Sequence, residues 1–284
     1  MKTISNRVFR RSTSAHPCLA GRRAYVRTVL VLSLFLTGCA TVYNPATGRK
    51  EMIFIDSAQE VQIGRSMAEN IVTKENRLLQ DPVAQRRVNT IGQRIARVSD
   101  RTEFVYHFSV LDNEDLNAFA LPGGYVYIYN GLMKKLDDTE IAGVLAHEVA
   151  HVAAKQSVKS MQSALGYNML LTVAMAGLGG KDPAIAQNIS GVSNVVYGLL
   201  SRGYSRQDEL FADKLAVKYM KAAGYDPHGF VRVLELLNTQ NGPSGRVFEV
   251  LSTHPRMQER IRQADEEIAR LEAAGPSTAP AATP

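Results

Sequence analysis

The sequence has little cysteine: only Cys18 and Cys39 among its 284 residues. Both lie near the N-terminus, so the rest of the chain has no pair of thiols to oxidise, which excludes a fold held together by internal disulfides. Long apolar runs are also missing, since the longest candidate, residues 164–178, is interrupted by Asn168 and is too short to span a bilayer. The chain is nevertheless 45% hydrophobic, which is enough for a large core and excludes disorder as its dominant state.

Acidic side chains are absent from residues 1–38, which hold seven of the 33 Lys and Arg residues. The remaining 26 basic side chains are balanced by 27 Asp and Glu residues, so the net charge of +6 belongs to the N-terminal segment. A basic surface on the folded part is therefore not indicated, and we predict no nucleic-acid partner.

The N-terminal segment is ordered like a bacterial export signal, with a basic stretch, an apolar stretch over residues 29–36 and small residues before Cys39. The run Leu36-Thr37-Gly38-Cys39 resembles the lipobox of bacterial lipoproteins, which implies cleavage before Cys39 and lipidation of its sulfur. Because Ala40 rather than Asp follows, the resemblance implies a lipid anchor on the periplasmic face of the outer membrane of a diderm bacterium. An ordinary secretion signal with a fortuitous cysteine, or a twin-arginine signal at Arg22-Arg23, is the alternative.

Composition divides the chain into four segments. We predict a lipoprotein signal peptide at residues 1–38 and a lipidated tether without hydrophobic period at residues 39–50. Residues 273–284 are of low complexity and are predicted to be a disordered tail. One domain without internal repeats remains at residues 51–272.

Helical patterns dominate the domain. We expect helices near residues 58–75, 82–98, 138–155, 157–178, 184–201, 206–222, 227–239 and 255–271. Alternating apolar residues predict strands at 104–111 and 125–129. Many helices with a small sheet predict an α+β fold.

The run His147-Glu148-Val149-Ala150-His151 carries the first chemistry. Two histidines four residues apart share one helix face and can bind one metal ion. Glu148 lies about 100° round the helix from His147, which suits it to a water on the metal rather than to the metal itself. The alternative is a pair of solvated or core-satisfied histidines. It is disfavoured because this helix is apolar on nearly every side, and a buried helix must satisfy its polar groups.

A metal site of this kind needs a third protein ligand from another element. Glu209 and Asp213 share one face of the predicted helix at 206–222. One carboxylate could bind the metal while the other orients a ligand histidine through its second ring nitrogen. An amphipathic surface helix with acids in its first turn is the alternative.

Three runs together resemble a known family: residues 147–151, 205–213 and 117–124. They are similar to the HtpX/CAAX prenyl endopeptidase family of zinc metallopeptidases, and within it to the periplasmic lipoprotein branch that contains BepA and LoiP. The similarity extends from about residue 43 to 270. It implies a mostly helical, zincin-type (gluzincin) domain with a small antiparallel-edged sheet.

The resemblance also implies roles for single residues. One zinc ion per chain would be bound by His147, His151 and Glu209, with Glu148 as the general base. Asp213 would orient a ligand histidine without binding the metal itself. The implied function is a hydrolase of protein quality control, an endopeptidase that cleaves misfolded or unassembled envelope proteins. The alternative is a latched, non-proteolytic lipoprotein that binds clients or the outer-membrane assembly machinery. The presence of Glu148 favours the protease, because a binding module needs no base beside the metal.

Peptide hydrolysis passes through a tetrahedral oxyanion, and the sequence does not fix which side chain donates a hydrogen bond to it. Tyr204, Arg206, His254 and Arg260 are the candidates, and we single out His254 and Arg206. His254 is predicted to act either as a transition-state donor or as a fourth ligand that holds the resting enzyme closed. Its simpler interpretation is a helix cap before Pro255.

Two further segments carry functional hypotheses. Asn117, Ala118, Phe119 and Ala120 are predicted to form an exposed edge strand beside the metal-binding helix, where an extended substrate adds as another strand. A plain turn at residues 122–124 is compatible with the same segment. Residues 157–201 are predicted to form a lid, with a glycine-rich turn at 177–180. Membrane contact by residues 164–178 is the alternative to a buried or cleft-covering helix.

Overall fold

In the computed structural model of the protein, the described residues are 41–71, 77–163, 166, 203–239, 254 and 256–274. The predicted signal peptide with Cys39, the predicted helix at 184–201 and nearly all of the predicted tail lie outside these residues. The same holds for most of the predicted lid, of which residues 157–163 are described as helical. Among the described residues, no helix combines the length and the apolar character needed to cross a bilayer.

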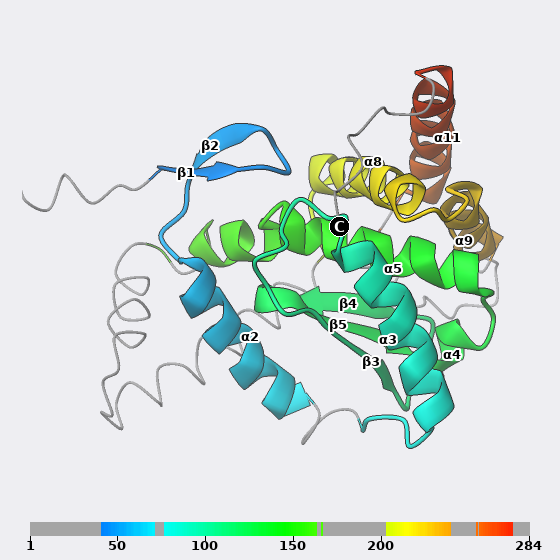
Figure 1. The fold of residues 1–284 in the computed structure, drawn as a ribbon, viewed down its shortest axis with the longest axis horizontal. Helices are drawn as coiled ribbons and strands as arrows, with labels where there is room; N and C mark the ends of the chain where they lie inside the picture. Colours follow the sequence, from blue (N-terminus) through cyan, green and yellow to red (C-terminus); the bar gives the residue numbers. More distant parts are fainter. Residues whose placement is uncertain are drawn as a thin grey trace, which may run out of the picture. The chain divides into compact units, whose positions relative to one another are not determined.

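A three-stranded sheet supports the site. Its strands are β3 (His107–Leu111), β4 (Ala118–Leu121) and β5 (Tyr125–Tyr129), in the order β3-β5-β4 (Figure 1). β3 runs parallel to β5, whereas β4 runs antiparallel to it and forms an edge. The predicted strand at 125–129 is confirmed. The predicted strand at 104–111 is three residues shorter, because β5 begins at Tyr125, which pairs with His107 and leaves residues 104–106 without a partner strand among the described residues.

The two faces of the sheet are covered by different helices. α2 (Ser57–Asn70) covers one face, and α3 (Pro82–Ala96) and α5 (Asp138–Ala153) cover the other. The alternation of β5 matches this arrangement, since successive side chains point to opposite faces. Val126 and Ile128 pack in the core with α3 and α5, whereas Tyr127 and Tyr129 pack in the core with α2.

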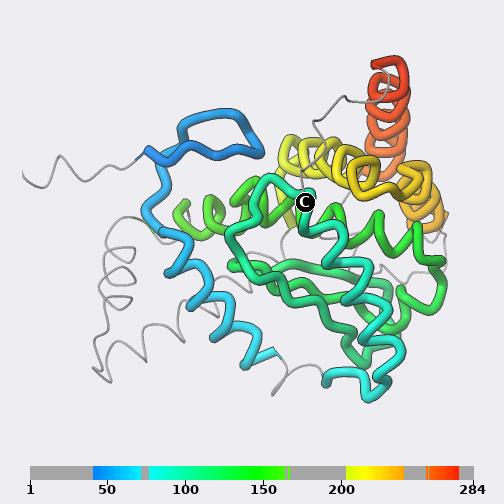
Figure 2. Tube along the Cα trace, viewed as in Figure 1, coloured from blue at the N-terminus to red at the C-terminus, as the bar shows by residue number. Residues whose placement is uncertain are grey.

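Helix α5 lies at the centre of the domain, between the sheet and α8 (Arg206–Ala222), as Figure 2 shows. α9 (His228–Thr239) also packs on α5, and α11 (Met257–Ala273) packs on α8 and α9. Every α5 residue from Ile141 to Ala153 is buried, which is why its sequence is apolar on nearly every side. A capping box starts the helix, in which Asp137 accepts from the Glu140 amide at 2.8 Å.

Two short helices and a hairpin complete the described elements. The 3₁₀ turn η2 (Pro122–Gly124) joins β4 to β5, and α4 (Asn130–Met133) follows β5. β1 (Thr41–Asn44) and β2 (Arg49–Met52) form an antiparallel hairpin. Most of the predicted tether at 39–50 forms this hairpin. The hairpin is held by polar contacts that no hydrophobic period reveals: buried Asn44 donates to the Ala154 carbonyl at 3.3 Å, and Lys159 pairs with Glu51 at 2.7 Å.

The predicted α+β class is confirmed, with helices as the dominant element. The ends of α3, α5, α8, α9 and α11 lie within a few residues of their predicted positions. α2 is helical as predicted up to Asn70, and the predicted end near residue 75 lies outside the described residues.

Candidate metal centre

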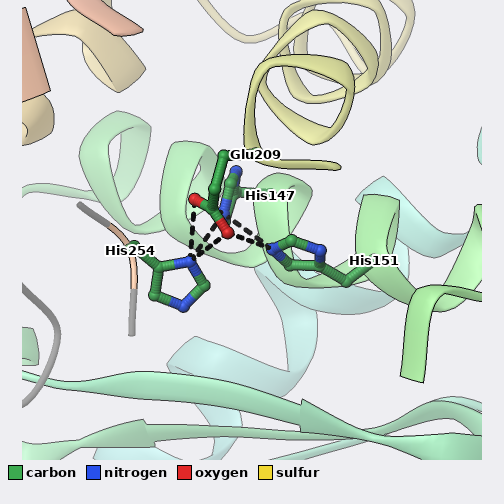
Figure 3. A group of neighbouring side chains, drawn as sticks. All are labelled: His147, His151, Glu209 and His254. Carbon is green, nitrogen blue, oxygen red and sulfur yellow. Dashed lines mark hydrogen bonds and ion pairs between the residues drawn. The ribbon is translucent and has the colours of Figure 1, made fainter. Parts of the chain in front are cut away.

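Four buried side chains converge between α5 and α8 (Figure 3). His147 and His151 come from α5, Glu209 comes from α8, and His254 comes from the segment before α11. One nitrogen or oxygen of each side chain lies within 4.8 Å of those of the other three. Within the described part of the chain, these four form the one group of His, Cys, Asp and Glu side chains with the spacing of a metal site.

Local structure explains how these residues meet. The i, i+4 spacing brings the Nε2 atoms of His147 and His151 to 3.0 Å from each other. Ser205 caps α8 by accepting from the Asp208 amide, which places Glu209 in the first turn of a helix that packs on α5. The Glu209 carboxylate lies 3.6 Å from His147 Nε2 and 3.5 Å from His151 Nε2.

The distances fit a bound metal better than a hydrogen-bonded cluster. Two nitrogens bound to one tetrahedral ion at ordinary bond lengths lie about 3.3 Å apart. His147 Nε2 lies 3.0 Å from His151 Nε2 and 3.3 Å from His254 Nδ1. A single ring nitrogen cannot donate to one histidine and accept from a second while a carboxylate also faces it, so the convergence calls for a cation. Imidazole nitrogens with a carboxylate are a donor set for divalent transition metals.

The ring nitrogens that face away from the centre are also engaged. His147 Nδ1 lies 2.9 Å from Asp213 Oδ1. Asp213 in turn accepts from Arg260, whose Nη2 and Nε lie 2.7 and 2.8 Å from its two oxygens. His151 Nδ1 contacts Oε1 of Gln156. Such contacts fix the orientation of a ligand ring and leave its other nitrogen free to bind metal.

Charges around the centre keep its carboxylates ionised. Burial alone would raise the pKa of Glu209, but His254 and Arg260 lower it well below the ordinary range. Burial likewise acts to raise the pKa of Asp213, and Arg260 reverses the effect and lowers it. Burial would lower the pKa of His254, but the neighbouring Glu209 raises it. The site is thus a network of compensated charges around an anionic ligand.

Glu148 stands beside the four ligand candidates rather than among them. Its Oε1 lies 3.9 Å from His254 Nε2, and the side chain is buried. Burial raises the pKa of Glu148, which brings the carboxylate closer to the range where it exchanges protons at neutral pH. A mainly apolar pocket adjoins it, lined by residues that include Ala118, Leu132, Val144, His147, Phe230, Val233 and Leu237.

The predicted substrate strand lies next to this pocket. β4 begins at Ala118, one residue after Asn117, and packs against α5. The strand is not exposed as predicted, because this packing leaves Asn117, Ala118 and Ala120 at most 4% exposed. Of the described strands, only β5 pairs with β4, so the second edge of β4 has no strand partner among them. Ala118 and Glu148 line the same pocket. Phe119 faces away, and its ring stacks on Tyr127 at 5.2 Å.

Arg206, singled out from the sequence as an oxyanion donor, does not reach the site. Its guanidinium pairs with Glu259 on the surface, and its side chain is 55% exposed. The arginine at the centre is Arg260, the other sequence candidate, because α11 packs on α8 with Arg260 facing Asp213. Tyr204, a third candidate, stacks on the His151 ring at 4.0 Å, and its hydroxyl lies 2.7 Å from that of Ser157.

Two residues around the centre escaped sequence reasoning. Phe230 stacks on the His147 ring at 5.7 Å, and Gln156 contacts His151. α9 can bring Phe230 there because a Cβ at Gly143 of α5 would lie only 2.8 Å from Phe230 Cα. The signals in the sequence for this close helix crossing are Gly143, one turn before His147, and Gly229 of α9, where a Cβ would lie 2.6 Å from the Thr139 side chain of α5.

Comparison with known proteins agrees with this geometry. The chain is 29% identical over 199 residues to the beta-barrel assembly-enhancing protease of Escherichia coli (strain K12), which covers 66% of this chain and 39% of that protein. It is 32% identical over 156 residues to metalloprotease LoiP of the same strain, covering 55% of this chain and 60% of LoiP. It is 30% identical over 183 residues to the mitochondrial metalloendopeptidase OMA1 of Schizosaccharomyces pombe, covering 63% of this chain and 51% of OMA1.

The chain therefore spans well under half the length of the first of these relatives. A family model matches more than half of the chain. The match extends over residues 82–268 and includes all four side chains of the centre. As the sequence motifs predicted, the chain belongs to peptidase family M48, a family of metallopeptidases.

Proposed function

We propose that the protein is a zinc-dependent endopeptidase of the bacterial cell envelope. The observation that carries this proposal is the convergence of His147, His151 and Glu209, with Glu148 beside them in an adjoining pocket. Two histidines and a glutamate are the ligand set of many catalytic zinc sites. Zinc is favoured over softer or harder metals by this mixture of imidazole and carboxylate.

The reaction is the hydrolysis of a peptide bond. When bound, zinc polarises the substrate carbonyl and lowers the pKa of a water molecule toward about 7. Glu148 takes a proton from the attacking water and delivers it to the leaving nitrogen as the C–N bond breaks. Asp213, held by Arg260, keeps the His147 ring in place through its Nδ1.

His254 is proposed as a fourth ligand of the resting enzyme. Its Nδ1 lies 2.9 Å from both Glu209 oxygens and 3.3 Å from His147 Nε2, which supports a ligand more than a remote oxyanion donor. A catalytic zinc site keeps one position open, so a fourth protein ligand restrains hydrolysis until it moves away. The same observation favours the second candidate function, a latched lipoprotein that binds clients without cleaving them.

The proposed substrates are unfolded segments of misfolded or unassembled envelope proteins. The edge of β4 that pairs with no described strand lies beside the Glu148 pocket and can accept an extended chain through main-chain hydrogen bonds, a mode that selects unfolded segments over particular side chains. Asn117, Ala118, Phe119 and Ala120 would form this contact. The name of the Escherichia coli relative, a beta-barrel assembly-enhancing protease, supports assembly machinery as a further partner.

The proposed location is the periplasmic face of the outer membrane. It is supported by the lipobox-like run that ends at Cys39 and by the residue after it, Ala40. Lipidation of Cys39 would anchor the domain there, with the hairpin at 41–52 following directly.

Zinc content and casein hydrolysis, measured together, test the function. The purified chain is compared with Glu148→Gln and His254→Ala. We expect one zinc per chain in all three, hydrolysis lost by about 10²–10⁴-fold in Glu148→Gln and increased in His254→Ala. Loss of hydrolysis in both variants would make His254 a catalytic donor instead. Bound zinc without hydrolysis of any unfolded substrate in any form would favour the binding lipoprotein, and absence of zinc from the wild type would contradict both.

A further inference from the structure

Gln156 is a buried residue just beyond the C-terminal end of α5, with 2% of its surface exposed. We propose that Gln156 is a positioning residue of the metal centre, which fixes the tautomer of His151 and thereby aims the Nε2 lone pair of that ring at the metal. The inference rests on the metal centre of the proposed function and adds a residue to it.

The orientation of the Gln156 amide follows from its second contact. Its Nε2 lies 3.0 Å from the backbone carbonyl oxygen of Asp208, which can only accept a hydrogen bond. The NH₂ end of the amide must therefore face Asp208, and the oxygen end must face His151. This assignment needs no observed hydrogen atom, because the carbonyl leaves one choice.

The tautomer of His151 follows in turn. An amide oxygen cannot donate, so His151 Nδ1, which contacts Gln156 Oε1, must carry the proton. A neutral imidazole holds one proton, which leaves a lone pair on His151 Nε2. That nitrogen is the one that faces Glu209, at 3.5 Å, and His147, at 3.0 Å. The ring is thus prepared for metal before any metal arrives.

The same amide couples the two helices of the site. Gln156 follows His151 by five residues, and Asp208 immediately precedes the ligand candidate Glu209. The chain returns toward α8 because Lys155 adopts a left-handed backbone with φ of 55°. One side chain therefore ties the position of His151 to the first turn of α8, where Glu209 lies.

The two α5 histidines are held by unlike partners. His147 is held by Asp213, an anion that Arg260 compensates. His151 is held by a neutral amide, which supplies an acceptor without a further negative charge near Glu209 and Glu148. A carboxylate at position 156 would need its own counter-ion, because a buried charge without a partner is costly.

Three variants separate positioning from general packing. Gln156→Met keeps the length of the side chain and removes both the acceptor and the donor, whereas Gln156→Glu keeps the acceptor for His151. Gln162→Met is the matched control, since the Gln162 amide also bridges two backbone groups, the Phe54 amide at 2.7 Å and the Met52 carbonyl at 3.1 Å, without contacting the site. Each purified protein is titrated with Zn²⁺ against a chromophoric chelator, and ¹⁵N spectra of the metal-free proteins report the His151 tautomer.

We expect Gln156→Met to weaken Zn²⁺ binding by about 10–100-fold, Gln156→Glu to weaken it less, and Gln162→Met to leave it unchanged. His151 should carry its proton on Nδ1 in the wild type and shift toward Nε2 in Gln156→Met. Equal Zn²⁺ affinity in Gln156→Met and in the control, or equal losses in Gln156→Met and Gln156→Glu, would overturn the inference.

The spectra also separate this inference from the proposed function. If the wild type bound no Zn²⁺, the proposed metal centre would fail, whereas the tautomer in the metal-free wild type would still decide the role of Gln156. A proton on Nε2 of wild-type His151 would overturn the inference by itself, even if Gln156→Met failed to fold.

Discussion

Two clusters of charged side chains, each built around a buried arginine, lie against α5, and they differ in how their polar atoms meet. The Arg101 cluster, formed by Arg101, Glu60 and Glu103, contacts the C-terminal end of the helix. Arg101 Nη1 donates to Glu60 at 3.0 Å and to the Val152 carbonyl at 3.2 Å, and its Nε donates to Glu103 at 2.8 Å. Every one of these contacts joins a donor to an acceptor.

The metal centre has the opposite character. There, nitrogen faces nitrogen: His147 Nε2 lies 3.0 Å from His151 Nε2, while the Nδ1 atoms of both rings already have partners. The Arg101 cluster is complete by itself, and the metal centre becomes complete only with a cation. Burial of charge alone therefore does not mark a functional site; histidine ring nitrogens that converge on one another do.

The largest effect should come from breaking the complete cluster. In Arg101→Met the buried Glu60 carboxylate, 1% exposed, loses its main partner, so we expect the free energy of unfolding to fall by about 3–5 kcal/mol. Arg262→Met is the control, because Arg262 and Glu266 form an exposed pair on α11 that contributes less than about 1 kcal/mol. Urea unfolding of the zinc-loaded proteins measures both. Equal losses in the two variants would contradict the distinction between the clusters.

Removal of the metal should affect only the second cluster. Zinc at about 1,000 times its Kd stabilises a folded protein by about 4 kcal/mol, so a chelator should lower the melting temperature of the wild type. Arg101→Met should show the same chelator-dependent decrease in melting temperature, although its melting temperature with zinc is already lower than that of the wild type. In Glu209→Gln, which loses an anionic ligand, the shift should shrink. An unchanged chelator-dependent shift in Glu209→Gln would show that Glu209 is not a metal ligand.

A smaller effect is expected at the helix crossing that supports His147. Gly143→Ala places a methyl group 2.8 Å from Phe230 Cα and forces α9 away from α5. Overpacking of this kind costs about 1–3 kcal/mol, and the displaced Phe230 ring should also slow casein hydrolysis. Thermal unfolding and hydrolysis rates measure the two effects. Wild-type stability in Gly143→Ala would show that the crossing has room for a methyl group.

The smallest effect concerns a third, half-exposed group of charges at the hairpin. Burial acts to raise the pKa of Glu51, but hydrogen bonds from Lys159, Asn44 and Thr47 lower it below its ordinary value of 4.5. A carboxylate with a lowered pKa stabilises the fold above that value and loses its contribution as the pH falls through the folded-state pKa. Protection factors for hydrogen exchange at residues 41–52, which correct for the pH dependence of the intrinsic exchange rate, should therefore fall below pH 4.5, and less so in Glu51→Gln. Identical profiles for the two proteins would contradict this account of the hairpin.

Local patterns predicted the parts of the site that lie on one helix. The i, i+4 spacing of His147 and His151 and the apolar surroundings of α5 are properties of consecutive residues, and both are present in the structure. Glu209 was foreseeable as a helical carboxylate, and the family resemblance selected it over Asp213. The strand at Tyr125–Tyr129 was visible because its alternation matches two covered faces.

The features of the fold and of the site that the sequence did not predict depend on contacts between distant segments. The start of β3 is set by its register with Tyr125, and the choice of Arg260 over Arg206 is set by the packing of α11 on α8. The hairpin at 41–52 is held by Asn44 and Glu51, whose partners lie more than a hundred residues away. Gln156 carries no signal in isolation, because its role appears only when Asp208 lies opposite His151.

Zinc K-edge X-ray absorption of the zinc-loaded wild type and of His254→Ala tests the central claim most directly. The convergence of His147, His151, Glu209 and His254 on one point predicts three imidazole nitrogens and carboxylate oxygen at about 2.0–2.2 Å in the wild type. In His254→Ala the account predicts two imidazoles, with a solvent oxygen in place of the third. An equal number of imidazoles in both proteins, or a shell made of oxygen alone, would contradict it.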